Sequence, residues 1–493
     1  MPREGSTKVL RWRLPVSARG ATAPPSCAVP QSEAEELDVA RVGRAVVIGA
    51  GFVGLLAAQV LARHVERVLL VDQDQLPAGP TPRRGTPQAR HSHLLWSGGA
   101  RAVERIVPGA LTRLQTRGAN RIALPAQLLS MSSAGWMRRF AGEQYLLACS
   151  RDLLDWTLRE EILLDGAIEV SWGCQATSLV GDQHQVRGIR LYEAQHRREI
   201  EVSCDLLVIA TGRASRAEDW LVGLGLPAPP TKIIHPGVFY VTHAFQAPRS
   251  MRDGFPLVSI HPSPNQPTLV RAGSLVPIEE GLWHVTLSVI RGTRPPARSQ
   301  DFIALARQAR TPFLADLISL AQPIGSVRVT RATSNYRKYV ELLPAWPQGL
   351  LLIGDALTAY NPFYGHGMSA GARGVLELDG ALSDGGHEFN SRAVQRSVVE
   401  TTRVPWAIAS RQDREFAEHS SRPSLTHRTT MSFLRRLLAT ANEDPMVAEA
   451  MLDVYTLSKS HLRLLSPQII ARILIGSRVP PLDHPPLTQA FYC

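Results

Sequence analysis

The chain has 493 residues, of which 44% are hydrophobic and 20% are charged, a balance typical of globular proteins with a sizeable buried core. This length predicts two or three domains. No run of about 18 apolar residues occurs, so we expect no membrane span.

The formal net charge is +11, and such a surface can attract nucleic acid, a membrane surface or an acidic partner. Aromatic and basic residues do not alternate in the way that base-stacking proteins require, so we expect no nucleic-acid partner. An arginine-rich, solvated surface accounts for most of the charge. An acidic carrier protein that presents a tethered substrate stays open.

The five cysteines have no disulfide or zinc spacing and are odd in number: Cys27, Cys149, Cys174, Cys204 and Cys493. They favour a reducing, cytoplasmic location and predict no metal site. The segment 1–43 holds several prolines and arginines but no continuous apolar stretch. We therefore expect a disordered N-terminal extension there, rather than a secretory signal.

The first ordered elements spell strand, glycine turn, helix and strand. The apolar run 45–48 precedes Gly49, Gly51 and Gly54, which form a G-x-G-x-x-G motif at the start of a helix. In such a motif the first glycine permits a tight turn, the second lets the backbone approach a pyrophosphate, and the third allows close packing of helix on strand. Asp72 ends the second strand 18 residues after Gly54 (72 − 54), where a carboxylate accepts hydrogen bonds from a ribose. We expect dinucleotide binding.

The middle of the chain alternates between helices and short strands. Periodicity predicts helices over 99–119, 153–164 and 301–320, and strands over 143–148, 168–207 and 205–210. Four further runs rich in Val, Ile, Thr and aromatic residues predict an antiparallel sheet with a face of its own: 237–246, 256–261, 268–276 and 282–291. From about residue 366 onward the pattern is mostly helical.

A second glycine-rich segment follows the buried strand 349–353. That strand ends in Gly354-Asp355, and the sequence Asn361-Pro-Phe-Tyr-Gly365-His-Gly-Met368 then opens a helix of small residues. Asp355 is suited to bind a polyol, and backbone N–H groups at Gly367 and Met368 can stabilise negative charge on a ring. A structural N-cap at Asp355 is the competing interpretation.

These two segments resemble those of FAD-dependent monooxygenases, the superfamily of aromatic hydroxylases and squalene epoxidases. The segment 84–96, with Pro-Gln-Ala-Arg-His at 87–91, resembles more closely the polyether polyketide epoxidases of the monensin and lasalocid type. The resemblance covers roughly residues 44–385. It implies an α/β fold with a Rossmann-type FAD-binding domain of the second glutathione-reductase (p-hydroxybenzoate hydroxylase-like) type, an antiparallel-sheet substrate domain and a helical C-terminal region.

The resemblance also implies domain boundaries. We expect a discontinuous FAD-binding domain and a β-sheet substrate domain that interrupt each other, followed by the helical region. The FAD-binding domain is assigned to 44–115, 141–235 and 335–385, the substrate domain to 116–140 and 236–334, and the helical region to 386–493.

The residues that match the family's motifs fall into two groups. The cofactor-binding group comprises Gly49, Gly51, Gly54, Asp72, Arg90, Arg151 and Asp355. The flavin-ring environment comprises Pro362, Gly365, Gly367 and Met368. No residue is assigned as a catalytic acid or base, and the two histidines His91 and His93 lack a third ligand with metal spacing nearby.

The implied activity is epoxidation of alkenes in a linear polyketide or polyene through a flavin C4a-hydroperoxide. Where aromatic hydroxylases carry Asp-Gly, this chain has Thr211-Gly212, which favours electrons from NAD(P)H through a separate flavin reductase. The partners are then O2, an apolar substrate and that reductase. A flavin-dependent hydroxylase, a prenyl-type reductase and a halogenase remain alternatives. The tryptophan-rich halogenase stretch and its lysine are not seen.

Overall fold

The computed structural model describes residues 42–75, 77–263, 268–384, 389–417, 425–477 and 479–487. Most of the predicted extension 1–43 lies outside these ranges, and the first strand already begins at Val42. The domain boundaries proposed from the sequence stay predictions. Among the described residues, no helix is long and apolar enough to cross a membrane.

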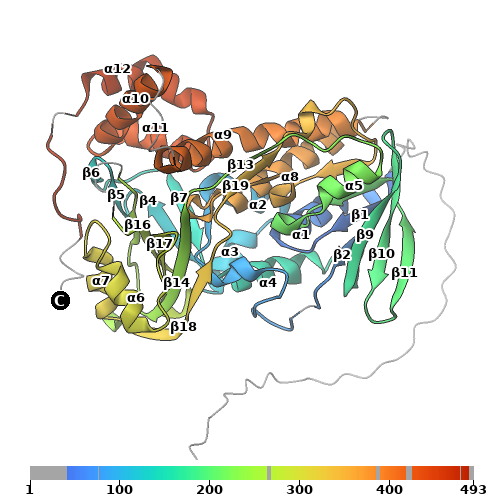
Figure 1. Ribbon diagram of the computed structural model, residues 1–493, viewed down its shortest axis with the longest axis horizontal. Coiled ribbons are helices and arrows are strands. Elements are labelled where there is room, and N and C mark those ends of the chain that lie inside the picture. The colour runs from blue at the N-terminus through green and yellow to red at the C-terminus, as the bar shows by residue number, and fades with distance from the viewer. Residues whose placement is uncertain are drawn as a thin grey trace, which may run out of the picture. The chain divides into compact units, whose positions relative to one another are not determined.

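A five-stranded parallel sheet forms the first layer, in the order β20-β12-β1-β2-β8 (Figure 1). Its strands are β1 (Val42–Ile48), β2 (Val65–Asp72), β8 (Ile168–Trp172), β12 (Leu206–Ile209) and β20 (Leu350–Leu352). All four side chains of β12 are fully buried. The apolar runs are continuous because both faces of a parallel sheet are covered.

Helices and a small meander provide that cover. The helices are α1 (Phe52–Leu61), α2 (Ser97–Ile106), α3 (Ala110–Thr116), α4 (Arg151–Ile162), α5 (Ala217–Gly223) and α8 (His366–Asp384). The antiparallel meander consists of β9 (Cys174–Gly181), β10 (Val186–Glu193) and β11 (Arg198–Ser203). Apolar side chains of the meander join the core of the parallel sheet.

A seven-stranded sheet forms the second part, in the order β18-β14-β17-β16-β15-β5-β6. Its strands are β5 (Leu128–Ser132), β6 (Gly135–Trp136), β14 (Val238–Gln246), β15 (Leu257–Ile260), β16 (Val270–Pro277), β17 (Leu282–Ile290) and β18 (Gln322–Thr330). The sheet is antiparallel except between β5 and β15, which run parallel. Side chains such as Phe245 and Trp283 pack one of its faces against α6 (Ser299–Ala306) and α7 (Phe313–Ser319).

Two three-stranded sheets connect these parts. One contains β3 (Leu94–Trp96), β7 (Gln144–Ala148) and β4 (Asn120–Leu124), and the other contains β13 (Thr231–Ile234), β19 (Asn335–Lys338) and β21 (Thr358–Ala359). Of these two sheets, the sequence patterns predicted only the strand at 143–148, which corresponds to β7. The other strands are too short for a recognisable alternation of polar and apolar residues.

The C-terminal region is helical, as expected, with α9 (Ser391–Ala417), α10 (Leu425–Ala441), α11 (Pro445–Tyr455) and α12 (Pro467–Ile475). Figure 1 shows α10, α11 and α12 gathered beside β5 and β6 of the seven-stranded sheet. Met137, just after β6, packs into their apolar cluster, and Asn442 donates a hydrogen bond to the carbonyl of Ala134. The region therefore closes over one end of that sheet.

Two predicted helices are each interrupted. The segment 99–119 divides into α2 and α3 around Pro108, and 301–320 divides into α6 and α7 before Phe313. Pro108 directly follows the C-cap of α2, and its ring and missing N–H prevent the helix from continuing. Pro312 lies beyond the end of α6 at Ala306 and is the N-cap of α7, so it marks the start of the second helix rather than the end of the first.

Candidate active site

The carboxyl ends of four parallel strands meet at one edge of the five-stranded sheet. The segments that follow β1, β2, β12 and β20 all line one cavity of about 960 Å³. Such an edge is where open parallel sheets bind ligands. The two glycine segments therefore lie together although about 300 residues separate them.

The three glycines of the first turn have different surroundings. Gly49 has φ +98°, and an added Cβ would lie 2.6 Å from the carbonyl oxygen of Ala210. A Cβ on Gly54 would lie 1.7 Å from the carbonyl oxygen of Gly49, so only glycine permits this packing. A Cβ on Gly51 would meet nothing within 4 Å. Gly51 thus faces open space where the backbone borders the cavity, while Gly54 does not line it.

The start of α1 has the features of an anion-binding helix terminus. Gly51 is the N-cap, no side chain caps the helix, and its first turn holds no acidic residue. The free N–H groups and the positive end of the helix dipole therefore face the cavity without an internal counter-charge.

Asp72 is held beside this turn. Its carboxylate accepts hydrogen bonds from the backbone N–H groups of Ala50 at 2.7 Å and Asp74 at 2.8 Å. Arg83 lies against it, with Nη1 3.5 Å from Oδ2 of Asp72 and Nη2 donating to the carbonyl of Ala50 at 3.0 Å. Nη1 of Arg83 is buried without a hydrogen-bond partner among the described residues. A ligand with hydroxyl or phosphate oxygens can satisfy it.

Sequence analysis gave Arg83 no site role. Its signal was weak, because a lone Arg-Arg pair in a proline-rich loop is usually solvated. The fold brings this loop back over the first turn, so Arg83 lines the cavity together with Asp72.

Asp355 is held by arginines at the end of β20. Its Oδ2 lies 3.4 Å from Nε of Arg213, and Arg213 also donates hydrogen bonds to the carbonyls of Ser334 and Tyr360. Burial raises the pKa of the Asp355 carboxyl, while Arg213 and, more weakly, Arg151 lower it. Arg213, which was not among the assigned residues, thus joins three separate segments at the cavity edge.

Arg151 begins α4 and also lines the cavity. Its Nε lies 2.7 Å from Oδ1 of Asp155, and its guanidinium lies over the ring of Phe52 at 5.6 Å. These contacts fix the side chain beside α1, where its charge acts on Asp355.

The second glycine turn is fixed from behind by a buried polar network. Gly365 has φ +65°, and a Cβ there would lie 3.1 Å from Nε1 of Trp96, which donates to the carbonyl of Tyr364. Pro362, Gly365, Gly367 and Met368 all line the cavity. Helix α8 begins directly afterwards with no acidic residue in its first turn, so its N–H groups are also available.

The network converges on Asp413 of α9, another residue that the sequence gave no reason to choose. Its carboxylate accepts hydrogen bonds from Asn335, from Asn361 at 2.9 Å and from the hydroxyl of Tyr364 at 2.7 Å. Tyr240 of the seven-stranded sheet donates to Oδ1 of Asn361. One buried carboxylate thereby connects the C-terminal region, the sheet and the turn.

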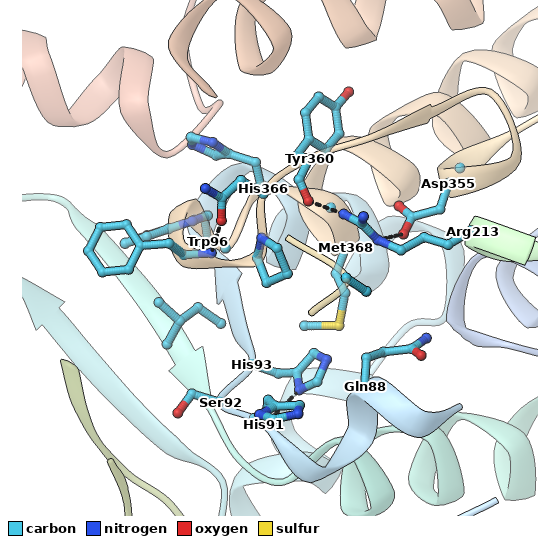
Figure 2. A pocket seen from close by; sticks show the side chains of 18 of the residues that line it. Gln88, His91, Ser92, His93, Trp96, Arg213, Asp355, Tyr360, His366 and Met368 are labelled. Atoms are coloured by element: carbon cyan, nitrogen blue, oxygen red, sulfur yellow. Dashed lines mark hydrogen bonds and ion pairs between the residues drawn. The ribbon is translucent and has the colours of Figure 1, made fainter. Parts of the chain in front are cut away.

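The Pro-Gln-Ala-Arg-His segment contributes unevenly to the cavity. Gln88, His91 and His93 line it, whereas Arg90 is exposed and lies outside the lining. In Figure 2 the side chain of Met368 points toward His93 and Gln88. The structure therefore does not bring Arg90 together with the other assigned residues.

The cavity histidines are held neutral. Burial, with smaller contributions from His284 and nearby arginines, lowers the pKa of His91 to about 4. Burial and then Arg151 lower the pKa of His93 to about 3. Nδ1 of His93 lies 2.8 Å from the carbonyl of His91, so this nitrogen carries the proton. Across the described residues, no group of three His, Cys, Asp or Glu side chains is arranged to hold a metal.

The remaining walls belong to the seven-stranded sheet and the C-terminal helices. The aromatic residues of the sheet strands 237–291 and of the second glycine turn are candidates for an apolar substrate wall, and of these Tyr240 and Phe363 line the cavity. Four others lie in hydrophobic cores instead: Phe239, Phe245, Trp283 and Tyr364. The apolar wall comes mainly from α10 and α11, through Met431, Leu434, Leu437, Leu438, Met451 and Leu452.

Comparison with known proteins agrees with this geometry. A family model described as FAD binding domain matches residues 43–385. A curated relative, Protein Rv3254 of Mycobacterium tuberculosis (strain ATCC 25618 / H37Rv), is 26% identical over 449 residues, which cover 87% of this chain and 93% of the relative.

Two solved structures share the fold at low identity. The flavin-dependent brominase Bmp2 matches with a TM-score of 0.61 and 16% identity, covering 84% of this chain and 92% of its own. The p-nitrophenol 4-monooxygenase PnpA from Pseudomonas putida DLL-E4 matches with a TM-score of 0.58 and 16% identity, covering 89% and 100%. The predicted fold class is thereby confirmed. The free helix start, the open space at Gly51 and the Arg83 nitrogen that forms no hydrogen bond to a described residue fit a bound FAD.

Proposed function

We propose a monooxygenase activity from one premise: the chain belongs to the FAD-binding-domain family and its cofactor is FAD. The proposed reaction adds one oxygen atom from O2 to an elongated, largely apolar substrate. In its specific form, the reaction is epoxidation of an alkene in a linear polyketide or polyene. The support for this form is the resemblance of the segment 84–96 and the second glycine turn to those of polyether polyketide epoxidases.

Different residues of the chain would bind different parts of the cofactor. The start of α1 receives the pyrophosphate, and Asp72 with Arg83 receives the adenosine ribose. Asp355, supported by Arg213 and Arg151, receives the ribitol and phosphate region. The segment 362–368 would hold the ring, and a bound, reduced flavin would supply the chemistry that activates O2.

The observation that carries the proposal is the continuity of the cavity. The residues that line this one cavity extend from the two glycine turns to the seven-stranded sheet and to the apolar side chains of α10 and α11. We infer that a cofactor held at the two glycine turns would leave the side of the cavity lined by α10 and α11 for a substrate. An apolar wall excludes water, and water would otherwise divert activated oxygen from the substrate.

The side chains near the ring suit transfer to an electron-rich carbon. His91 and His93 are neutral near pH 7 because burial holds their pKa at about 4 and about 3. Histidines with pKa values this low are weak bases near pH 7, so they are poor acceptors for a ligand's proton and place no full charge in the cavity. The N–H groups of Gly367 and Met368 are placed to stabilise negative charge on the ring.

The alternatives are distinguished by their chemistry. A halogenase of the kind considered above uses a lysine near the substrate, and the described lining of the cavity contains none. Bmp2 is a brominase and PnpA hydroxylates a nitrophenol by their names, so both chemistries exist on this fold. A reductase would saturate an alkene without O2.

We further propose that electrons arrive from NAD(P)H through a separate flavin reductase. Thr211-Gly212 stands where aromatic hydroxylases have Asp-Gly, and both residues line the cavity beside Arg213. A carrier-protein-tethered substrate is consistent with the basic net charge of +11.

The test is a reaction of the FAD-loaded protein with NADH, a flavin reductase, ¹⁸O2 and either a linear polyene or a phenol. Epoxidation predicts that the polyene gains one labelled oxygen atom and yields an oxirane by NMR. A phenol that gains the label while the polyene stays unchanged would identify an aromatic hydroxylase. A gain of two hydrogens, or a halogen in the presence of bromide, would identify a reductase or a halogenase.

A further inference from the structure

One row of side chains crosses the seven-stranded sheet in strict register. Ser130 of β5 pairs with Ser259 of β15, and Ser259 pairs with Ser274 of β16. Ser274 pairs in turn with Thr286 of β17, and Thr286 with Thr242 of β14. We call these five residues the hydroxyl row.

The hydroxyl row belongs to the face of the sheet that borders the cavity. Ser130, Ser259, Ser274 and Thr286 line the cavity directly, and Thr242 contacts His91 of its lining. Because successive side chains of a strand point to opposite faces, the neighbours of these residues, such as Trp283 and Val285, lie in the apolar core on the other side. The polarity of the row is therefore confined to the ligand side.

The spacing of the row is set by the backbone. Neighbouring strands lie about 4.8 Å apart, so five hydroxyls in register extend over about 19 Å. This is a regular line of hydrogen-bonding groups along one wall of an elongated cavity. A ligand that forms hydrogen bonds along this line must be an extended chain with polar atoms along one edge.

The two ends of the row differ in how their hydroxyls are satisfied. At one end Thr286 bonds Thr242 at 2.8 Å and Ser92 at 3.0 Å, and Thr242 also bonds Nδ1 of His91 at 2.8 Å. At the other end, Ser130 and Ser274 make no side-chain hydrogen bond to any described residue. Ser259 between them bonds only Nε2 of His261, at 3.2 Å.

Ser130 is the clearest sign of a ligand. Only 8% of its surface is exposed, yet its hydroxyl lacks a partner within the described residues and faces the cavity. The hydroxyl is accessible from the cavity, so it is free to form a hydrogen bond with a ligand there.

A second part of the lining has the opposite character. The side chains of α10 and α11 that reach the cavity include Met431, Leu434, Leu437 and Met451. The substrate space therefore has one hydroxyl-lined wall and one apolar wall. A ligand that satisfies both has oxygen atoms along one edge and hydrocarbon along the other.

We propose that the hydroxyl row binds hydroxyl and carbonyl groups carried along one edge of an extended substrate, with Ser130 and Ser274 as its specificity-determining residues. This inference takes from the proposed function only the assignment of this cavity as the place where the substrate binds. It narrows the substrate class to oxygen-bearing, amphiphilic chains and excludes bare polyenes as the preferred ligand.

The experiment compares two linear polyenes of equal length, one a hydrocarbon and one bearing hydroxyl and ketone groups along the chain. Each is titrated into the oxidised FAD-loaded protein, and the dissociation constant is read from the change in the flavin absorption spectrum. We expect the oxygen-bearing chain to bind at least about tenfold more tightly, since each neutral hydrogen bond contributes about two- to twelvefold.

Variants then test whether the hydroxyl row causes the tighter binding of the oxygen-bearing chain. Ser130→Ala combined with Ser274→Ala should lower affinity for the oxygen-bearing chain about tenfold and leave affinity for the hydrocarbon unchanged. Ser130→Thr combined with Ser274→Thr keeps both hydroxyls and should retain the preference. Ser299→Ala, in α6 on the far side of the sheet, is the matched control and should change neither affinity. Flavin content and melting temperature show whether each variant is folded.

The outcomes separate this inference from the proposed function. Equal affinity of the native protein for both chains, or an alanine variant that weakens both equally, would overturn the role of the row even if labelled oxygen enters the product. Conversely, a preference that the alanine pair abolishes would support the row even if no oxygen is transferred. In that second case only the monooxygenase assignment fails.

Discussion

Asn361 donates a hydrogen bond from Nδ2 to the carboxylate of Asp413 at 2.9 Å, and through this bond helix α9 holds the second glycine turn at the cavity. The same asparagine accepts a hydrogen bond from the N–H of Phe363 at 3.1 Å and another from the hydroxyl of Tyr240. Its position is therefore determined from three directions. Both residues are almost fully buried.

The first prediction concerns Asp413. Asp413→Ala removes the acceptor of Asn335, Asn361 and Tyr364, and it leaves their buried donors without partners. Because each unsatisfied buried group costs about 1–3 kcal/mol, we expect the free energy of unfolding to fall by at least about 3 kcal/mol. Urea unfolding measures this. The control is Asp316→Ala in α7, an exposed carboxylate that should change stability by less than about 1 kcal/mol.

A structural loss alone would not show that Asp413 positions the turn. We therefore expect a second effect below the unfolding transition: flavin absorption and fluorescence should differ from those of the native holoprotein. A destabilised variant whose bound flavin has an unchanged spectrum would contradict the positioning role.

The second prediction compares two glycines of the same turn. Gly51→Ala places a methyl group in open space, so the protein should fold with nearly unchanged stability in the absence of FAD. The methyl group occupies the approach to the pyrophosphate, and FAD affinity should fall on the order of tenfold or more.

Gly54→Ala instead brings Cβ to 1.7 Å from the Gly49 carbonyl oxygen and should prevent folding. Isothermal titration with FAD and circular dichroism distinguish the two, and tight FAD binding by Gly51→Ala would refute the assignment of the turn.

The early part of the fold was predictable because its signals are local. The glycine motif, the apolar strand β1 and Asp72 lie within about 30 residues. Their types and spacing match the pattern that a dinucleotide-binding strand, turn, helix and strand require. Residues of the second turn were also identifiable from their glycine spacing. Both segments line one cavity in the structure.

The supporting residues could not be predicted from the sequence. Arg83, Arg213 and Asp413 act through partners that are distant in the chain: Arg213 meets Tyr360, and Asp413 meets Asn335. Each is an ordinary polar residue in its local context, so nothing in the sequence marks it. The hydroxyl row was hidden for a similar reason, since register between strands depends on turns and bulges that a single strand does not encode.

The third prediction concerns pH. Burial lowers the pKa of His366 to about 4, whereas an unfolded histidine titrates near 6.5. The unfolded state therefore binds more protons between these values, and His366 contributes stability that is fully present above pH 6.5 and is lost as pH falls toward 4. His91, His261 and His284 have pKa values lowered to about 4 in the same way and add to this slope.

His366→Gln isolates one of these groups. Glutamine keeps a donor toward the carbonyl of Tyr455, which Nε2 of His366 contacts at 2.8 Å, but it does not titrate. The slope of unfolding free energy against pH should decrease by up to about 1.4 kcal/mol per pH unit between pH 4 and 6.5. Urea unfolding at several pH values provides the measurement. An identical slope in the variant would mean that His366 is protonated in the folded protein.

The last prediction tests the charge balance at Asp355. Burial raises the pKa of this carboxyl, and Arg213, with Nε 3.4 Å from Oδ2, is the principal group that lowers it. Arg213→Met keeps an apolar stem but removes the charge and the bonds to Ser334 and Tyr360. The pKa of Asp355 should then rise further, so the carboxyl becomes protonated at a higher pH than in the native protein.

Because an ionised carboxylate is the stronger acceptor for the cofactor's hydroxyl groups, FAD should dissociate from Arg213→Met at a higher pH as the solution is acidified. Arg190→Met, which removes an exposed arginine of β10 that is paired with Glu201 and does not line the cavity, is the matched control and should retain FAD as the native protein does. FAD release is followed by its fluorescence increase during acid titration, and coincident release curves for the two variants would show that Arg213 does not govern the charge of Asp355.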